Sequence, residues 1–490
     1  MILFQGDTSS QGEDHSLEMA KSFVYRLSLR LLQEAPGLNL YAAHSNYTWG
    51  GEEALPTVVD AALKELGQLK GQDPGSEPAL GWPVTAACTS TGLPANGAHP
   101  DTQGKIGSAS RANRQVNLKW NAHDEATDRL RSLFSDIGSG KEFDWTDNFD
   151  SLADLPGHND SYIAVVHADG NGMGARIKAL TDEWGKKPKE SRAYIQRMRE
   201  LSNRVQETAQ DALKRTVKAL MDHLGDYEGP GPKQHPTDET EEIVNGKSMK
   251  KTQKYLPVRP IVFGGDDVTL VCAGPWGLAI AQRYLQELEE ENLGADKSDK
   301  PYACAGVAIV KTHYPFSQAY GLSAELIGSA KERAKDLADK KASALDWYYT
   351  TTGLTGDLKR MREREYKVPT GELNMTPIML HGDYKEGKYT WRNWDNFEKL
   401  MDTFGPDGKW TGQHNKTMRL REALRGGPDE VQKFEAIYVE KPEQSLPGLT
   451  LSPSDTLTHG WVKSQPLSSS DDQTEGHCAY FDAIEIAGQF

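Results

Sequence analysis

One short stretch, PIVFGGDDVTLVCAG at residues 260–274, limits what this 490-residue chain can fold into. Two apolar runs flank a Gly-Gly-Asp-Asp tip, which predicts a β-hairpin with buried strands and a turn that needs the positive φ of glycine. Asp266 and Asp267 are adjacent at the tip. Two carboxylates this close repel by roughly 4 kcal/mol at an effective dielectric constant of about 20, so they need a counter-charge such as Mg²⁺ or Mn²⁺. The alternative is an ordinary turn, since glycine and aspartate are common turn residues.

A second acidic residue follows an apolar strand, in SYIAVVHADGNGMG at residues 161–174, where the strand runs into Asp169 and then breaks at glycines. Over residues 160–350 the expected order is strand, helix, hairpin, helix, strand, helix. This order predicts a ferredoxin-like sheet with helices on one face, in which the first strand lies beside the hairpin. Asp169 would then reach the same ion as the hairpin carboxylates, as in two-metal phosphoryl transfer.

A basic residue completes the predicted site. In IGSAKERAK, residues 327–335, apolar side chains recur at helical spacing and Lys331 lies at the edge of that stripe. Lys331 could therefore reach a triphosphate, with Lys335 as the second choice, although most lysines on such helices are only solvated. His167, close to the strand end, is interpreted as a packed or hydrogen-bonded residue and not as a base.

Four segments together resemble a known family: DGNGMG, FGGDD, AGVAIVKTHYPF and LIGSAKERAK. They resemble the palm domain of the large subunit of type III CRISPR effector complexes, which is related to GGDEF diguanylate cyclases. The resemblance implies a nucleotidyl cyclase that joins ATP by 3′–5′ bonds into cyclic oligoadenylates and releases pyrophosphate. It implies catalytic, metal-binding roles for Asp169, Asp266 and Asp267. The nucleotide-binding residues would be Gly170, Asn171, Gly172, Gly264, Gly265, Lys331 and Lys335, although Asn171 also suits a turn.

Residues 1–122 are interpreted as a degenerate copy of the same palm. The expected elements are a strand at 1–7, a helix at 13–35, a hairpin at 39–49, a helix at 52–69, a strand at 81–95 and a helix from 107. His44, Ser45 and Asn46 fall where the copy should have Gly-Gly-Asp-Asp, and Ser110 falls where it should have lysine. The first copy is therefore expected to be catalytically silent.

The opening GDTSSQ resembles the start of the first palm in the CRISPR family. Because cyclisation requires two nucleotides held together, Asp7, Thr8 and Ser9 are expected to help bind the second one. The alternative is an ordinary strand end, or a remnant of an expression tag in view of LFQG.

The predicted fold class is α+β, with two ferredoxin-like palms, the first degenerate, and a C-terminal helical domain. Residues 123–159 are expected to be a linker or helical connection, and 160–350 the catalytic palm, with a polar surface insertion at 225–257. Residues 351–490 are expected to be mostly helical, and the resemblance implies contacts with neighbouring subunits and target RNA there.

Composition excludes several other classes. The 56 basic and 71 acidic residues give a net charge of −15, which disfavours nucleic-acid binding by the isolated chain. The four cysteines form no CxxC pair, so no zinc ribbon is predicted, and no apolar run suits a membrane, so we expect a cytoplasmic protein. His123 and Asp124 imitate an HD nuclease pair but stand alone, and they predict the start of a helix.

Three functions remain open. The first is a metal-dependent cyclase that makes a cyclic oligonucleotide messenger, most readily from ATP, for a downstream effector in antiphage defence. The second is an inactive nucleotide- or RNA-sensing subunit of a CRISPR-like complex. The third is a GTP-using diguanylate cyclase, although that family works as a homodimer of single palms. CRISPR-type protein subunits or an activating RNA are candidate partners.

Overall fold

The computed structural model of the chain describes most of its length. The described residues are 12–34, 40–72, 95, 97–98, 111–112, 123–138, 143–153, 161–225, 237–244, 247–294, 299–338, 341–350, 357–382, 390–405, 407–439, 445–464 and 476–488. They fall into two compact units. One unit comprises Met1–Ser132 with Gly174–Glu200, and the other comprises Leu133–Met173 with Leu201–Phe490.

The first unit is built mainly from helices. Its elements, some of which continue into the second unit, are α1 (Gly12–Glu34), α2 (Leu55–Gln72), β1 (Gly97–Ala98), β2 (Arg111–Ala112), α4 (His123–Leu133), α6 (Met173–Trp184) and α7 (Ser191–Gly225). The helices expected at 13–35, 52–69 and 123 are confirmed. None of the described helices is long and apolar enough to cross a membrane.

Two predictions for the degenerate palm are wrong where the structure describes them. Residues 40–48 of the expected hairpin form no strand, and most side chains from Ser45 to Trp49 are exposed, so no buried face would hold a sheet together. Arg111–Ala112, expected in a helix, pairs with Gly97–Ala98 as an antiparallel strand. The strands expected at 1–7 and 81–95 lie outside the described residues.

The palm of the second unit contains a six-stranded sheet with the order β13-β10-β9-β4-β8-β7. Its strands are β4 (Tyr162–Gly170), β7 (Val258–Gly264), β8 (Asp267–Ala273), β9 (Ala303–Lys311), β10 (Ala344–Tyr349) and β13 (Ile378–Met379). The four strands β9, β4, β8 and β7 pair antiparallel in the ferredoxin-like order, and β10 extends the sheet parallel to β9. The predicted α+β class with a ferredoxin-like palm is confirmed.

Helices cover both faces of this sheet, whereas the sequence predicted helices on one face. Gly277 of α8 (Gly277–Glu289) lies very close to the sheet. A Cβ atom added at Gly277 would be 2.5 Å from Ala164 Cβ on β4 and 3.2 Å from Val307 Cγ1 on β9. The helix α9 (Phe316–Ala338) lies equally close to Gly306 of β9, because a Cβ atom added at Gly306 would be 2.2 Å from the carbonyl oxygen of Ser323. Because successive strand residues point to opposite faces, α8 and α9 pack on opposite sides. The central strands β4 and β9 are buried nearly throughout, so both faces need cover.

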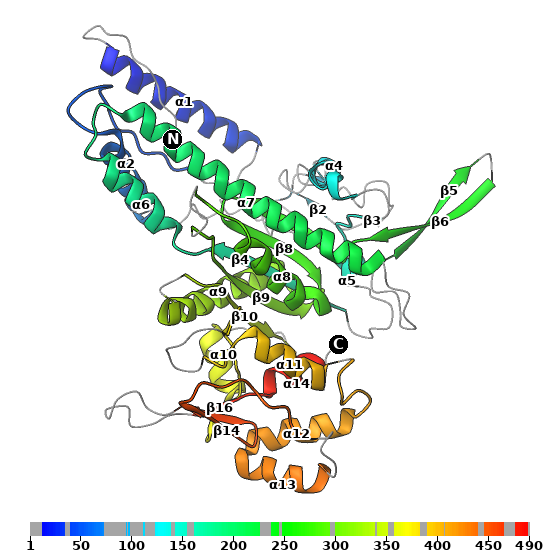
Figure 1. Cartoon of the computed structure of the whole chain (residues 1–490). Coiled ribbons are helices and arrows are strands. Elements are labelled where there is room, and N and C mark those ends of the chain that lie inside the picture. The colour runs from blue at the N-terminus through cyan, green and yellow to red at the C-terminus, as the bar shows by residue number, and fades with distance from the viewer. Residues whose placement is uncertain are drawn as a thin grey trace. The chain divides into compact units, whose positions relative to one another are not determined.

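The polar insertion predicted at 225–257 contains regular structure. After α7 ends at Gly225, β5 (Thr237–Val244) and β6 (Lys247–Tyr255) pair antiparallel, and β6 also pairs with the short β3 (Phe143–Asp144). Figure 1 shows the β5–β6 ribbon extending away from the palm sheet.

The C-terminal part combines helices with a small sheet that the sequence did not predict. The helices are α10 (Leu358–Glu365), α11 (Trp394–Phe404), α12 (His414–Gly426), α13 (Pro428–Tyr438) and α14 (Phe481–Ala487). The sheet has the order β11-β12-β16-β15-β14, with strands at Lys367–Val368, Gly371–Glu372, Gly476–Cys478, Trp461–Ser464 and Asp455–Thr458.

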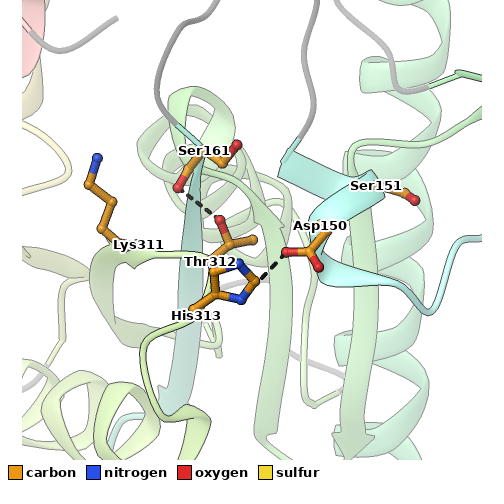
Figure 2. Close-up of a pocket in the computed structure, with 6 residues that line it drawn as sticks. All are labelled: Asp150, Ser151, Ser161, Lys311, Thr312 and His313. Carbon is orange, nitrogen blue, oxygen red and sulfur yellow. Dashed lines mark hydrogen bonds and ion pairs between the residues drawn. The ribbon is translucent and has the colours of Figure 1, made fainter.

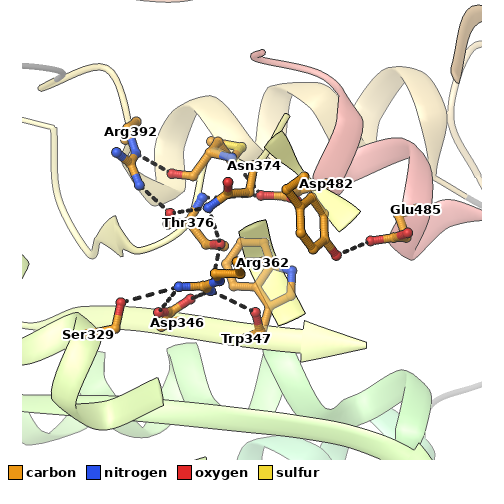
Figure 3. A network of polar contacts seen from close by, with 11 residues as sticks. Ser329, Asp346, Trp347, Arg362, Asn374, Thr376, Arg392, Asp482 and Glu485 are labelled. Atoms are coloured by element: carbon orange, nitrogen blue, oxygen red, sulfur yellow. Dashed lines mark hydrogen bonds and ion pairs between the residues drawn. The ribbon is translucent and has the colours of Figure 1, made fainter. Parts of the chain in front are cut away.

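A buried polar network joins α10 to the palm (Figure 3). Arg362 makes two hydrogen bonds to the fully buried carboxylate of Asp346 on β10, at 2.5 and 3.1 Å, and a third to Ser329 on α9 at 3.3 Å. The carboxylate of Asp482 on α14 accepts hydrogen bonds from the backbone N–H groups of Met375 at 2.7 Å and Thr376 at 3.2 Å. Burial raises the pKa of Asp482 to about 7.

Candidate active site

The hairpin tip and the end of the first palm strand lie side by side, as the sequence predicted. Asp169 on β4 is the direct partner of Asp267 on β8 across the antiparallel ladder. The Gly170 N–H donates to the Asp266 carbonyl at 3.2 Å. Gly265 has a φ of 67°, which lets the chain reverse between β7 and β8. Two segments about a hundred residues apart therefore bring three carboxylates to one edge of the sheet.

The glycines at this edge have distinct roles. A Cβ at Gly170 would lie 2.8 Å from Asp266 Cβ and 3.0 Å from Oδ2, so only glycine lets the tip pack this closely. A Cβ at Gly264 or Gly265 would have no atom within 4 Å. The outer surface of the tip therefore has open space beside both glycines.

The environment of Asp266 raises the pKa of its carboxyl group. Burial is the largest cause that raises its pKa, and the neighbouring carboxylates Asp169 and Asp267 add to the increase. Lys331 acts in the opposite direction, because its positive charge favours the ionised form. These effects place one ammonium and three carboxylates within electrostatic reach of one another.

Lys331 projects from α9 to this edge and forms an ion pair with Asp169, with both side chains about one-third exposed. Lys335, one turn further along the helix, is exposed. Of the two lysines proposed from the sequence, Lys331 is therefore the one that meets the carboxylates.

Two aromatic residues accompany the predicted ones. His167 Nε2 lies 3.0 Å from Asp267 Oδ1, and the imidazole stacks on Tyr320 of α9 with ring centroids 5.0 Å apart. Tyr284 of α8 is fully buried, and burial together with the charge of Asp266 raises its pKa. Sequence reasoning missed Tyr320 and Tyr284. His167 could have been linked to the site, because it shares a strand face with Asp169.

Asn171 supports the turn interpretation. Its side-chain amide donates to the Ala342 carbonyl at 2.9 Å and to Cys304 Sγ at 3.3 Å, and the side chain is buried. The following Gly172 has a φ of 76°, so it turns the chain out of the strand. The amide nitrogen of Asn171 is thus committed to internal hydrogen bonds.

The donor set suits a hard divalent cation. Among the described residues, no three His, Cys, Asp or Glu side chains are grouped so that they could hold a metal on their own. Mg²⁺ does not need such a cage, because one or two carboxylates together with substrate phosphates and water hold it. Asp169 and Asp267, paired across the ladder beside the half-buried Asp266, are the carboxylates that could offer such oxygens. Asp7, Thr8, Ser9 and Ser110 lie outside the described residues.

A separate hollow lies at the opposite end of the same strands (Figure 2). It has a volume of about 560 Å³ and is lined by Asp150, Ser151, Ser161, Lys311, Thr312 and His313. Lys311, at the end of β9, pairs with Tyr162, which begins β4. Gly170, beside the carboxylates, lies eight residues later, at the other end of β4. This hollow is therefore distinct from the carboxylate edge.

Comparison with known proteins identifies the palm. Residues 162–341 match the model of the Cas10/Cmr2 second palm domain. Similar solved structures include a Csm1–Csm4 subcomplex of the type III-A CRISPR–Csm interference complex (TM-score 0.34, 13% identity, covering 69% of this chain and 38% of that chain). They also include Csm1–Csm4 cassettes in complex with pppApApA (0.35, 13%, 69% and 38%) and with cA4 (0.32, 13%, 59% and 32%).

The present chain spans about a third of the length of those structural relatives. No curated protein matches it. The palm nevertheless resembles that of the type III CRISPR large subunit, as the hairpin and helix motifs predicted.

Proposed function

We propose that this palm is a metal-dependent nucleotidyl cyclase that joins nucleoside triphosphates, most readily ATP, into a cyclic oligonucleotide. The observation that carries the proposal is the pairing of Asp169 with Asp267 beside the half-buried Asp266, within a match to the Cas10/Cmr2 second palm. In each step a 3′-oxygen to phosphorus bond forms, the bond between the α- and β-phosphates breaks, and pyrophosphate leaves. The hydroxyl proton passes to water.

The residues at this edge of the sheet would have different roles in the reaction. Asp169, Asp266 and Asp267 would hold Mg²⁺ or Mn²⁺, which when bound would activate the attacking hydroxyl and neutralise phosphate charge. Gly264 and Gly265 leave the tip open for the triphosphate. The ammonium of Lys331, next to Asp169, would bind phosphate oxygens.

A nucleotide-sensing subunit without turnover is the second candidate. Lys331 beside Asp169 suits this candidate as well, because an ammonium group can bind phosphate oxygens without any turnover. In either case we propose a cytoplasmic protein that works with CRISPR-type subunits, and for the cyclase a downstream effector that responds to the product.

Mass spectrometry of the reaction products separates the candidates. The protein is incubated with ATP, GTP, CTP and UTP, singly and mixed, with Mg²⁺ or Mn²⁺, beside an Asp266→Asn, Asp267→Asn variant. The cyclase predicts a cyclic product that the variant does not make. Nucleotide binding without product, in every mixture and with added RNA, would support the sensor. A product containing only guanine would indicate a diguanylate cyclase.

A further inference from the structure

We infer that His167 is a positioning residue that orients the carboxylate of Asp267 for metal binding. The inference rests on the proposed function, because it takes Asp267 to be a metal ligand. His167 lies on β4 two residues before Asp169, so both side chains point to the face that α9 covers. The imidazole is buried, with 8% of the residue exposed.

The hydrogen bond to Asp267 defines which nitrogen of the imidazole carries the proton. Nε2 lies 3.0 Å from Asp267 Oδ1, and because an ionised carboxylate only accepts, Nε2 carries the proton and donates. Nδ1 is buried and has no hydrogen-bond partner among the described residues. Within the described part of the chain, no second hydrogen bond therefore competes with Asp267 for the ring.

Aromatic stacking fixes the plane of the ring. His167 and Tyr320 stack with centroids 5.0 Å apart and an interplanar angle of 21°. Tyr320 in turn stacks on Phe316, one turn earlier in α9, at 6.4 Å and 26°. Gly306, directly opposite His167 on β9, has no side chain, which lets the α9 backbone approach the sheet and bring Tyr320 onto the imidazole.

A carboxylate with one oxygen held by a fixed donor cannot rotate freely about its terminal bond. Partners that orient metal ligands in this way typically contribute about 10- to 100-fold to metal affinity. Asp169 is held by the charged Lys331, whereas Asp267 is held by a ring nitrogen on the same strand face. Loss of the His167 donor would let Asp267 turn away and weaken metal binding.

Two substitutions separate the hydrogen bond from the stacking. His167→Phe keeps a ring against Tyr320 but removes the donor, whereas His167→Gln keeps an N–H donor but removes the ring. Mn²⁺ affinity of the protein saturated with a non-hydrolysable ATP analogue is measured by electron paramagnetic resonance, with thermal unfolding as the control for folding. We expect His167→Phe to bind Mn²⁺ about 10- to 100-fold more weakly than wild type. His167→Gln should recover most of the lost affinity.

The outcomes are distinguishable. If neither wild type nor the double variant Asp266→Asn, Asp267→Asn binds Mn²⁺, the proposed metal site fails, whatever the effect of the His167 substitutions. Wild-type affinity in a folded His167→Phe protein overturns the positioning role while the metal site stands. Equal losses in the Phe and Gln variants also overturn it, because packing would then be the cause. Should His167→Phe not fold, His167→Leu, which also lacks the donor, takes its place, and unchanged Mn²⁺ affinity there refutes the inference.

Discussion

Replacing Gly170 by alanine tests how closely the hairpin tip must approach β4. Gly170 is not among the glycines with positive φ, so alanine fits its backbone and only the new methyl group matters. That methyl would lie 2.8 Å from Asp266 Cβ, whereas ordinary contacts begin at 3.4 Å. The tip or the carboxylate must therefore shift by about 0.6 Å, and misplacement of about 1 Å at a reacting centre costs roughly 100-fold.

For Gly170→Ala we expect pyrophosphate release from ATP with Mn²⁺ to fall about 10- to 100-fold. Overpacking should also lower the free energy of unfolding by about 1–3 kcal/mol, measured with denaturant. Gly174→Ala is the matched control, because a Cβ there meets no atom within 4 Å and alanine suits a helix. A Gly170→Ala protein with wild-type rate and stability would refute the argument that Asp266 needs this close approach.

Three further experiments, at Lys331, Asp482 and Arg362, test other parts of the account. Lys331→Met should abolish most pyrophosphate release while Lys335→Met, on an exposed position of the same helix, leaves it unchanged; equal effects in a kinetic assay would rule out a specific role for Lys331. Since burial raises the pKa of Asp482 to about 7 from 3.8, the folded state binds the extra proton, and the free energy of unfolding should fall as pH rises from about 4 to about 7. The fall should be at most about 4 kcal/mol and then level off, and Asp482→Asn should remove it in denaturant titrations at each pH. Arg362→Met leaves the buried Asp346 unpaired and should cost about 3–5 kcal/mol, and a loss below about 1 kcal/mol would contradict the ion pair's importance.

The palm was predictable because its signals are local. Each of β4, β8 and β9 is a short, mostly buried apolar run bounded by glycine or charged residues, and the hairpin fixes β7 as a neighbour of β8 directly. The strand order then follows from a small set of allowed topologies. The sequence could therefore predict that Asp169 meets Asp267 across the sheet.

Features that depend on distant pairing were not predictable. Gly371–Glu372 pairs with Gly476–His477, about a hundred residues away, and strands of two or three residues leave no periodic pattern. The contact between His167 and Tyr320 depends on how α9 crosses the sheet, which hydrophobic spacing alone does not specify. For the same reason, the second helical layer on the α9 face was missed.

The central claim is that the carboxylates of the hairpin tip and of β4 form a metal-dependent nucleotidyltransferase site. The most direct test measures pyrophosphate release from ATP as a function of Mg²⁺ concentration, for wild type and for Asp267→Asn. The account predicts saturable, metal-dependent release that disappears in Asp267→Asn while thermal unfolding of the variant stays close to that of wild type. Metal-independent release, or equal release by the folded variant, would contradict it.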